Sequence, residues 1–119
     1  MNNQVLISPL YIGKPTEEID SLSCIDYYSS KKAAMILRAI NHKLRQHIIE
    51  LIHEHKRCTV TELYIKLRIE QSVASQHLGI LRRVGVVSTE RDGKYVFYTI
   101  NESRLETINK FVKNLLNKD

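Results

Sequence analysis

Apolar side chains recur every three or four residues in four successive segments of the chain, and this spacing predicts helices. The segments cover residues 22–40, 44–55, 60–67 and 71–84. The helical spacing of apolar residues then gives way to a different pattern. Residues 86–90 and 95–100 are rich in β-branched and aromatic side chains, which predicts two short strands. Helical spacing returns over residues 102–117. Residues 1–21 are interrupted by prolines and a glycine, which predicts an irregular N-terminal extension before one folded domain over 22–119.

Residues with capping chemistry mark the expected helix starts. Asn41 is expected to break the first helix and to cap the second. Thr59 and Glu62 have the spacing of a capping box, in which each side chain binds the backbone N–H of the other. We therefore expect a short helix to begin at Val60 and to bury Leu63 and Leu67.

The connections between the predicted elements indicate the fold. Residues 68–70 leave a three-residue turn between the third and fourth helices, and Gly85 suits the left-handed residue that follows a helix end. Asp92-Gly93, within the run 91–94, is a strong signal for a two-residue hairpin turn. The chain is therefore expected to be mainly α with a small β-hairpin (α+β). Two helices joined by a tight turn and followed by a two-stranded wing form a winged helix-turn-helix.

The helix predicted over residues 71–83 has an unusual outward side. An ordinary solvated face carries long charged side chains, whereas this one carries hydroxyls, an amide and a glycine. The second helix of a helix-turn-helix lies in the major groove of DNA, where small residues allow close approach and polar groups bind base edges. A solvated face that happens to carry small residues is the alternative interpretation. The candidate DNA contacts on this helix are Ser72, Ser75 and Gln76 for bases, with Gly79 letting the backbone come near, and Arg82 and Arg83 for phosphates.

Composition and charge narrow the class of partner. The 119-residue chain has a formal net charge of +5, and residues 31–100 hold thirteen Lys or Arg against six Asp or Glu. This excess favours an anionic partner such as nucleic acid. No apolar run is long enough to span a bilayer, the first residues do not resemble a signal peptide, and two cysteines are too few for a disulfide framework. We therefore expect a cytoplasmic protein that binds no membrane.

The run QSVASQHLGILRRVGVVSTERDGKYVFYTI, residues 71–100, resembles the ArsR-type winged-helix transcriptional repressors. The resemblance covers roughly residues 33–116 and leaves residues 1–30 unmatched. It implies a homodimer that binds a palindromic operator in double-stranded DNA, represses transcription, and is released by an effector. The resemblance places DNA contacts at Gln71, Ser72, Ser75, Gln76 and His77 on the helix, and at Arg91 and Lys94 on the hairpin tip.

His77 has two interpretations. It lies on the inward side of its helix, between Val73 and Leu81, so it is either a partly buried imidazole bonded to the backbone or a phosphate contact.

Dimerisation is expected through the N- and C-terminal helices, because both have apolar faces wide enough to need a partner. The candidate interface residues are Ile36, Leu37, Leu105, Ile108, Val112 and Leu115.

The metal sites of the resembled family do not carry over. Thr59 and Thr61 stand where a cysteine pair would bind a soft ion, and residues 102–119 contain no histidine. His53 and His55 are two residues apart and so point in different directions on a helix, and His42 and His47 add no ligand set, so exposed polar histidines are expected. We expect no metal site and no cofactor, and no motif identifies the effector.

Cys24 and Cys58 are either inert thiols or parts of a redox switch, and both interpretations stay open. Arg57, next to Cys58, is a mild hint that the pKa of this thiol is lowered. The chain shows no catalytic constellation, so we expect no enzymatic activity. The function that the pattern favours is a sequence-specific duplex-DNA-binding regulator. The alternative is a winged-helix module that docks a partner protein and does not bind DNA specifically.

Overall fold

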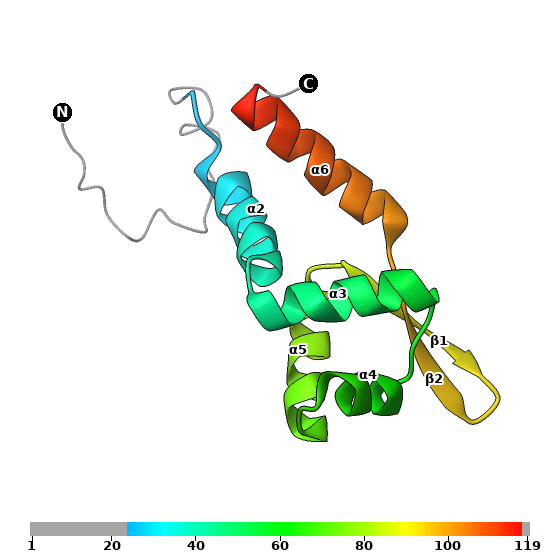
Figure 1. Ribbon diagram of the computed structural model, residues 1–119. Coiled ribbons are helices and arrows are strands. Elements are labelled where there is room, and N and C mark those ends of the chain that lie inside the picture. Colours follow the sequence, from blue (N-terminus) through cyan, green and yellow to red (C-terminus); the bar gives the residue numbers. More distant parts are fainter. Residues whose placement is uncertain (1–23, 118–119) are drawn as a thin grey trace. The chain divides into compact units, whose positions relative to one another are not determined.

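The computed structural model describes residues 24–117 (Figure 1). These residues form a mainly α chain with one antiparallel hairpin, the arrangement expected of a winged helix-turn-helix. The predicted irregular extension over residues 1–21 lies outside the described residues. The elements are α2 (Tyr27–Ile40), α3 (Lys43–His55), α4 (Val60–Leu67), α5 (Gln71–Arg83), β1 (Val87–Asp92), β2 (Tyr95–Ile100) and α6 (Glu102–Leu116).

The chain divides into two compact units between Arg38 and Ala39. The second unit contains the helix-turn-helix, the hairpin and α6. None of the helices within residues 24–117 is long and apolar enough to cross a membrane.

The start of α2 differs from the prediction. Residues 24–26 are not helical, so the helix begins at Tyr27 rather than near Leu22. The Asp26 carboxylate accepts a hydrogen bond from the Ser29 backbone N–H over 3.1 Å, which is the geometry of an N-cap. The backbone and side-chain hydrogen bonds from Ser29 hold the pKa of Asp26 below its usual value. A capping carboxylate therefore sets this boundary, and the apolar spacing alone did not reveal it.

The cap of α3 also differs from the prediction. The side chain that caps the helix belongs to His42, whose Nδ1 lies 3.5 Å from the Arg45 backbone nitrogen, and not to Asn41. Lys56, with φ of 74°, ends the helix. The expected helix over 44–55 is otherwise confirmed, with Ile48 and Ile52 fully buried on its inner side.

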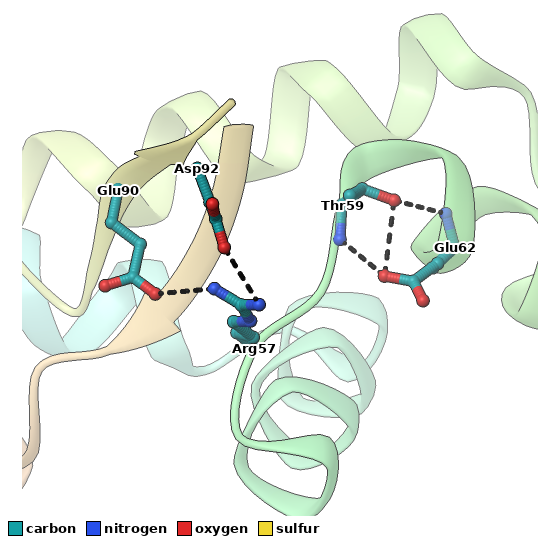
Figure 2. A network of polar contacts seen from close by, with 5 residues as sticks. All are labelled: Arg57, Thr59, Glu62, Glu90 and Asp92. Atoms are coloured by element: carbon teal, nitrogen blue, oxygen red, sulfur yellow. Dashed lines mark hydrogen bonds and ion pairs between the residues drawn. The ribbon is translucent and has the colours of Figure 1, made fainter. Parts of the chain in front are cut away.

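The helix α4 begins and ends where the sequence predicts, because its start is encoded locally. The Thr59 backbone N–H donates to the Glu62 carboxylate over 2.8 Å, and the Glu62 N–H donates to the Thr59 hydroxyl over 3.1 Å (Figure 2). This is the predicted capping box. Leu63 is fully buried, whereas Leu67 is only half-buried.

The end of α5 depends on Gly85. The Val86 N–H donates to the Leu81 carbonyl and the Gly85 N–H donates to the Arg82 carbonyl, both over 3.0 Å. This pair of bonds is a Schellman motif and requires a left-handed residue, which Gly85 supplies with φ of 78°. The predicted helix stop is confirmed, and it turns the chain directly into the buried residues Val86 and Val87.

The hairpin is longer than predicted on its first strand. The strand β1 (Val87–Asp92) pairs with β2 (Tyr95–Ile100). Because Asp92 lies opposite Tyr95, the loop consists of Gly93-Lys94 rather than residues 91–94. Gly93 has φ of 66°, and a positive φ at only the first loop residue is typical of a type II′ turn. The other edge of β2 is also paired, because the backbones of Cys58 and Tyr98 exchange two hydrogen bonds of 3.1 and 2.7 Å.

The core of the second unit lies between α3, α4, α5 and the hairpin. Its fully buried side chains come from each of these elements, so the inward side of α5 is held from three directions. This packing orients the opposite side of α5 outward. The largest fully buried residues are Ile48, Ile52, Leu63, Leu78, Leu81, Val86 and Val87.

Candidate nucleic-acid interface

The outward side of α5 presents polar side chains that have no partner among residues 24–117. Within the described part of the chain, their side chains make no hydrogen bond or ion pair, although buried Ala74, Leu78 and Leu81 fix the helix from behind. Their donors and acceptors are therefore available to an external partner. These exposed residues are Gln71, Ser72, Ser75 and Gln76.

Gly79 leaves open space on the same side of α5. A Cβ atom added there would meet no heavy atom within 4 Å, so packing inside the protein does not require a glycine at this position. The absence of a side chain lets a partner approach the helix backbone directly. Gly79 therefore extends the flat surface formed by Ser72, Ser75 and Gln76.

Four exposed cations lie beyond this flat surface. Arg82 and Arg83 occupy the last turn of α5, while Arg91 and Lys94 lie at the end of the hairpin. No ion pair within residues 24–117 engages any of them, although the Lys94 ammonium lies 5.4 Å from the centre of the Tyr95 ring. The structure thus leaves the predicted phosphate-contacting residues exposed and charged.

His77 occupies the predicted inward position but has a different partner from the predicted one. Its Nδ1 lies 3.1 Å from Nη1 of Arg45, and its ring lies 4.9 Å from the ring of His42. Since a guanidinium only donates hydrogen bonds, Nδ1 accepts and the neutral ring carries its proton on Nε2. The predicted bond to the backbone is therefore wrong.

The pKa of His77 is lowered by burial first and then by the nearby His42 and Arg45. Each of these causes disfavours the imidazolium form. His77 thus joins the start of α3 to the middle of α5, and a role in DNA contact stays a prediction.

A network around Arg57 was not predicted from the sequence. Its guanidinium carbon lies 3.9 Å from the centre of the Phe97 ring. Figure 2 shows the same guanidinium between two carboxylates of β1, with Nη1 3.5 Å from Glu90 and Nη2 3.3 Å from Asp92. The only signal in the sequence was the spacing of Glu90 and Asp92, which places both on one face of a strand.

The two cysteines differ in environment. Cys58 is 2% exposed, and burial followed by the charge of Glu62 raises the pKa of its thiol. A raised pKa disfavours the reactive thiolate. The Arg57 side chain, which was a hint of the opposite shift, is engaged on the hairpin instead. Cys24 is exposed, and a redox role for either thiol stays a prediction.

The predicted dimer residues fall into two groups. The chain itself buries Ile108 and half-buries Leu105 and Val112, whereas Leu115 is 64% exposed near the end of α6. Phe111 and Leu116 beside it are also exposed. In α2, Ile36 and Leu37 are half-buried. The open apolar area of α6 is therefore its last turn and a half.

The histidines of α3 do not gather into a cluster. His53 pairs with the exposed Glu102 over 3.3 Å, and His47 and His55 are exposed. Among the residues that the structure describes, no three His, Cys, Asp or Glu side chains are placed to hold a metal ion.

Comparison with known proteins places this geometry in context. Residues 42–89 match the bacterial regulatory protein, arsR family. The transcriptional repressor PagR of Bacillus anthracis is 33% identical over 88 residues, which cover 74% of this chain and 88% of PagR. The transcriptional activator HlyU of Vibrio cholerae is 32% identical over 87 residues, covering 73% of this chain and 80% of HlyU. The crystal structure of PagR matches with a TM-score of 0.60 at 32% identity and covers 73% of this chain and 99% of that one.

Proposed function

The chain belongs to the arsR family of bacterial regulatory proteins and is a DNA-binding transcriptional regulator, and from this membership we propose that it is a homodimeric repressor of a palindromic operator. The family and the relatives named above are regulators and not enzymes, in agreement with the expectation from the sequence. The proposal has three parts, which are the surface that reads the bases, the surface that binds phosphates and the surface that joins two copies.

The outward side of α5 carries the proposal. Its Ser72, Ser75 and Gln76 are exposed and unbonded within residues 24–117, next to the open space at Gly79. A major groove presents donors and acceptors in a pattern that differs for each base pair, and short polar side chains reach them when the helix backbone comes close. In this role α5 is the recognition helix.

Phosphate binding is assigned to the exposed cations at the end of α5 and on the hairpin. Backbone contacts position a regulator on the duplex, while base contacts provide sequence preference. If all four cations of each protomer contact phosphates, a dimer neutralises eight, and the slope of log K against log salt is about −7. The residues in this role are Arg82, Arg83, Arg91 and Lys94.

A second copy of the chain is proposed to cover the exposed apolar end of α6. Leu115 at 64% and Leu116 at 56% exposure are large apolar side chains in the last turn of a charged helix. A two-fold dimer gives two recognition helices, and a palindromic operator with half-sites about one DNA turn apart matches that symmetry. We propose repression, the role that the name of PagR states, with activation, the role that the name of HlyU states, as the alternative. A regulator of this kind works in the cytoplasm, where its DNA target lies.

The test is a fluorescence anisotropy titration against two duplexes across a range of salt concentrations. One duplex spans the region upstream of the chain's own gene, and the other is a scrambled sequence of the same length and composition. We expect tighter binding to the first, with an affinity that falls steeply between about 50 and about 200 mM salt. A protein-docking module would show no preference between the duplexes and would contradict the proposal.

Substitution on α5 identifies the reading surface. The variant S75A/Q76A should lower the ratio of the two affinities by about tenfold, because a good base contact discriminates by about 1–3 kcal/mol. Asn114→Ala, which changes an exposed side chain of α6, is the matched control and should leave the ratio unchanged. An unchanged ratio in S75A/Q76A would show that α5 does not read the sequence.

A further inference from the structure

The link between α3 and α4 holds the hairpin through one side chain and one pair of backbone bonds. Arg57 stacks on Phe97 at 3.9 Å and reaches Glu90 and Asp92 at 3.5 and 3.3 Å. The next residue, Cys58, exchanges two backbone hydrogen bonds with Tyr98. The link therefore behaves as a third strand on the open edge of β2, and Arg57 closes over one face of the hairpin (Figure 2).

The register shows which face Arg57 covers. Glu90 lies opposite Phe97, and Asp92 lies opposite Tyr95, so these four side chains share one face of the hairpin. Arg91, between the two carboxylates in sequence, points to the other face with its opposite residue Val96. Arg57 thus contacts the acidic face and leaves Arg91 free on the other.

The two carboxylates would oppose DNA binding without a counter-charge. A strand rises about 3.4 Å per residue, so the backbones of Glu90 and Asp92 each lie about 3.4 Å from that of Arg91, and Asp92 is two residues from Lys94. These separations are shorter than the Debye length of about 8 Å at physiological salt, so exposed carboxylates there would repel an approaching phosphate. The two positive charges at the end of the hairpin would then be cancelled by two negative ones.

We propose that Arg57 is a positioning residue for DNA binding: it pairs with Glu90 and Asp92, offsets one of their two negative charges and fixes the hairpin to the α3–α4 link, so that the end of the hairpin meets the duplex with a net positive charge. The inference rests on the proposed function, because it requires the hairpin to approach DNA. Arginine suits the role because its planar group stacks on a ring while separate nitrogens reach two acceptors, which the single ammonium of a lysine cannot do.

The test is a charge cycle in which the duplexes described above are titrated with wild type and four variants. R57Q exposes the two carboxylates, and we expect about fivefold weaker binding to both duplexes, the upper range for an exposed ion pair. R57Q/E90Q/D92N removes the repulsion and should return to within about twofold of wild type. E90Q/D92N with Arg57 present should bind at least as tightly as wild type. Lys110→Gln on α6 removes the same charge from an exposed side chain and should not reproduce the loss.

The cycle separates a positioning role from direct contact. If Arg57 itself bound a phosphate, the triple variant would stay as weak as R57Q, and that result would overturn the inference. Equal binding by R57Q and wild type would also overturn it. None of the substitutions changes the backbone atoms that bond Cys58 to Tyr98. Should R57Q still fail to fold, R57Q/E90Q/D92N compared with E90Q/D92N tests the same point: binding within about twofold supports the positioning role, and clearly weaker binding by the triple variant overturns it. Failure of wild type to bind either duplex would instead refute the proposed function.

Discussion

The guanidinium of Arg45 donates to Nδ1 of His77 over 3.1 Å, and this contact joins the first turn of α3 to the middle of α5. The guanidinium of Arg45 also donates from Nε to the Ala39 carbonyl. One arginine therefore connects Ala39, before α3, to α5. The contact requires a neutral His77, because the imidazolium would present a second donor to Arg45.

We expect this contact to make stability depend on pH. Burial, and then His42 and Arg45, lower the pKa of His77 below its ordinary value of 6.5. The unfolded chain therefore binds a proton on His77 at a pH where the folded chain does not. The contribution of His77 to the free energy of unfolding is therefore fully present above pH 6.5, and it is lost as the pH falls through the pKa of His77 in the folded chain.

Denaturant unfolding of wild type and H77N between about pH 7.5 and about pH 5 measures this effect. In H77N the amide oxygen still accepts from Arg45 but does not titrate. Subtracting the H77N stability curve from the wild-type curve therefore cancels the contribution of the other histidines. We expect wild type to lose more stability than H77N on acidification. Parallel curves would show that the folded His77 titrates as it does in the unfolded chain.

Gly79→Ala should have opposite effects on stability and on DNA binding. The added methyl group meets open space inside the protein, so the free energy of unfolding should rise by about 0.5–1 kcal/mol through helix propensity. The same methyl group lies where a duplex would approach, so the affinity for DNA should fall. Thermal unfolding and anisotropy on one preparation measure both. A stabilised variant with unchanged affinity would place Gly79 away from the duplex.

Asn101→Ala should destabilise the chain because its side chain makes three hydrogen bonds. Its Oδ1 accepts from the Arg104 N–H over 3.2 Å, which caps α6, and from the Ser103 hydroxyl over 3.0 Å, while its Nδ2 donates to the Gly85 carbonyl over 3.0 Å. We expect a loss of about 1–2 kcal/mol in the free energy of unfolding. Asn101→Asp keeps the cap and loses the donor, so it should lie between alanine and wild type. A loss as small as that of Asn114→Ala would contradict both roles.

How well each element could be predicted depends on how local its cause is. The bounds of α4 and the stop at Gly85 follow from residues within five positions of each other, and the sequence predicts both correctly. The outward side of α5 was also predictable, because helical spacing alone places Ser75 and Gln76 opposite the buried Leu78.

The contacts that spacing could not reveal join distant parts of the chain. Arg45 and His77 are 32 residues apart, and Arg57 and Glu90 are 33 apart, so no local period relates them. The missed cap at His42 has a different cause: an imidazole is an uncommon capping group, and the neighbouring Asn41 has the usual chemistry. The sequence therefore predicts the exposed polar side of α5 but not the side chains that hold α5 and the hairpin in place.

Leu115→Glu should separate the dimer without unfolding the chain. Leu115 is 64% exposed, so a charge there costs little within one chain, but it would be buried in the proposed contact between two copies. Sedimentation should show a monomer, and affinity for the operator should fall because only one recognition helix remains. Asn114→Glu adds the same charge to the neighbouring exposed polar residue and should stay dimeric. A dimeric Leu115→Glu variant would place the interface elsewhere.

The hairpin cations should govern affinity but not sequence preference. Arg91 and Lys94 are exposed at the end of the hairpin, and their proposed role is to bind phosphates, which are the same in every sequence. In R91A/K94A a dimer loses four such contacts, so the slope of log K against log salt should become less steep by about 4. The affinities for the upstream duplex and the scrambled duplex should fall together, leaving their ratio intact. Arg82 and Arg83 remain in this variant and retain part of the slope. If the ratio fell while the slope stayed constant, the hairpin would be reading bases, and the assignment of roles between α5 and the hairpin would have to be reversed.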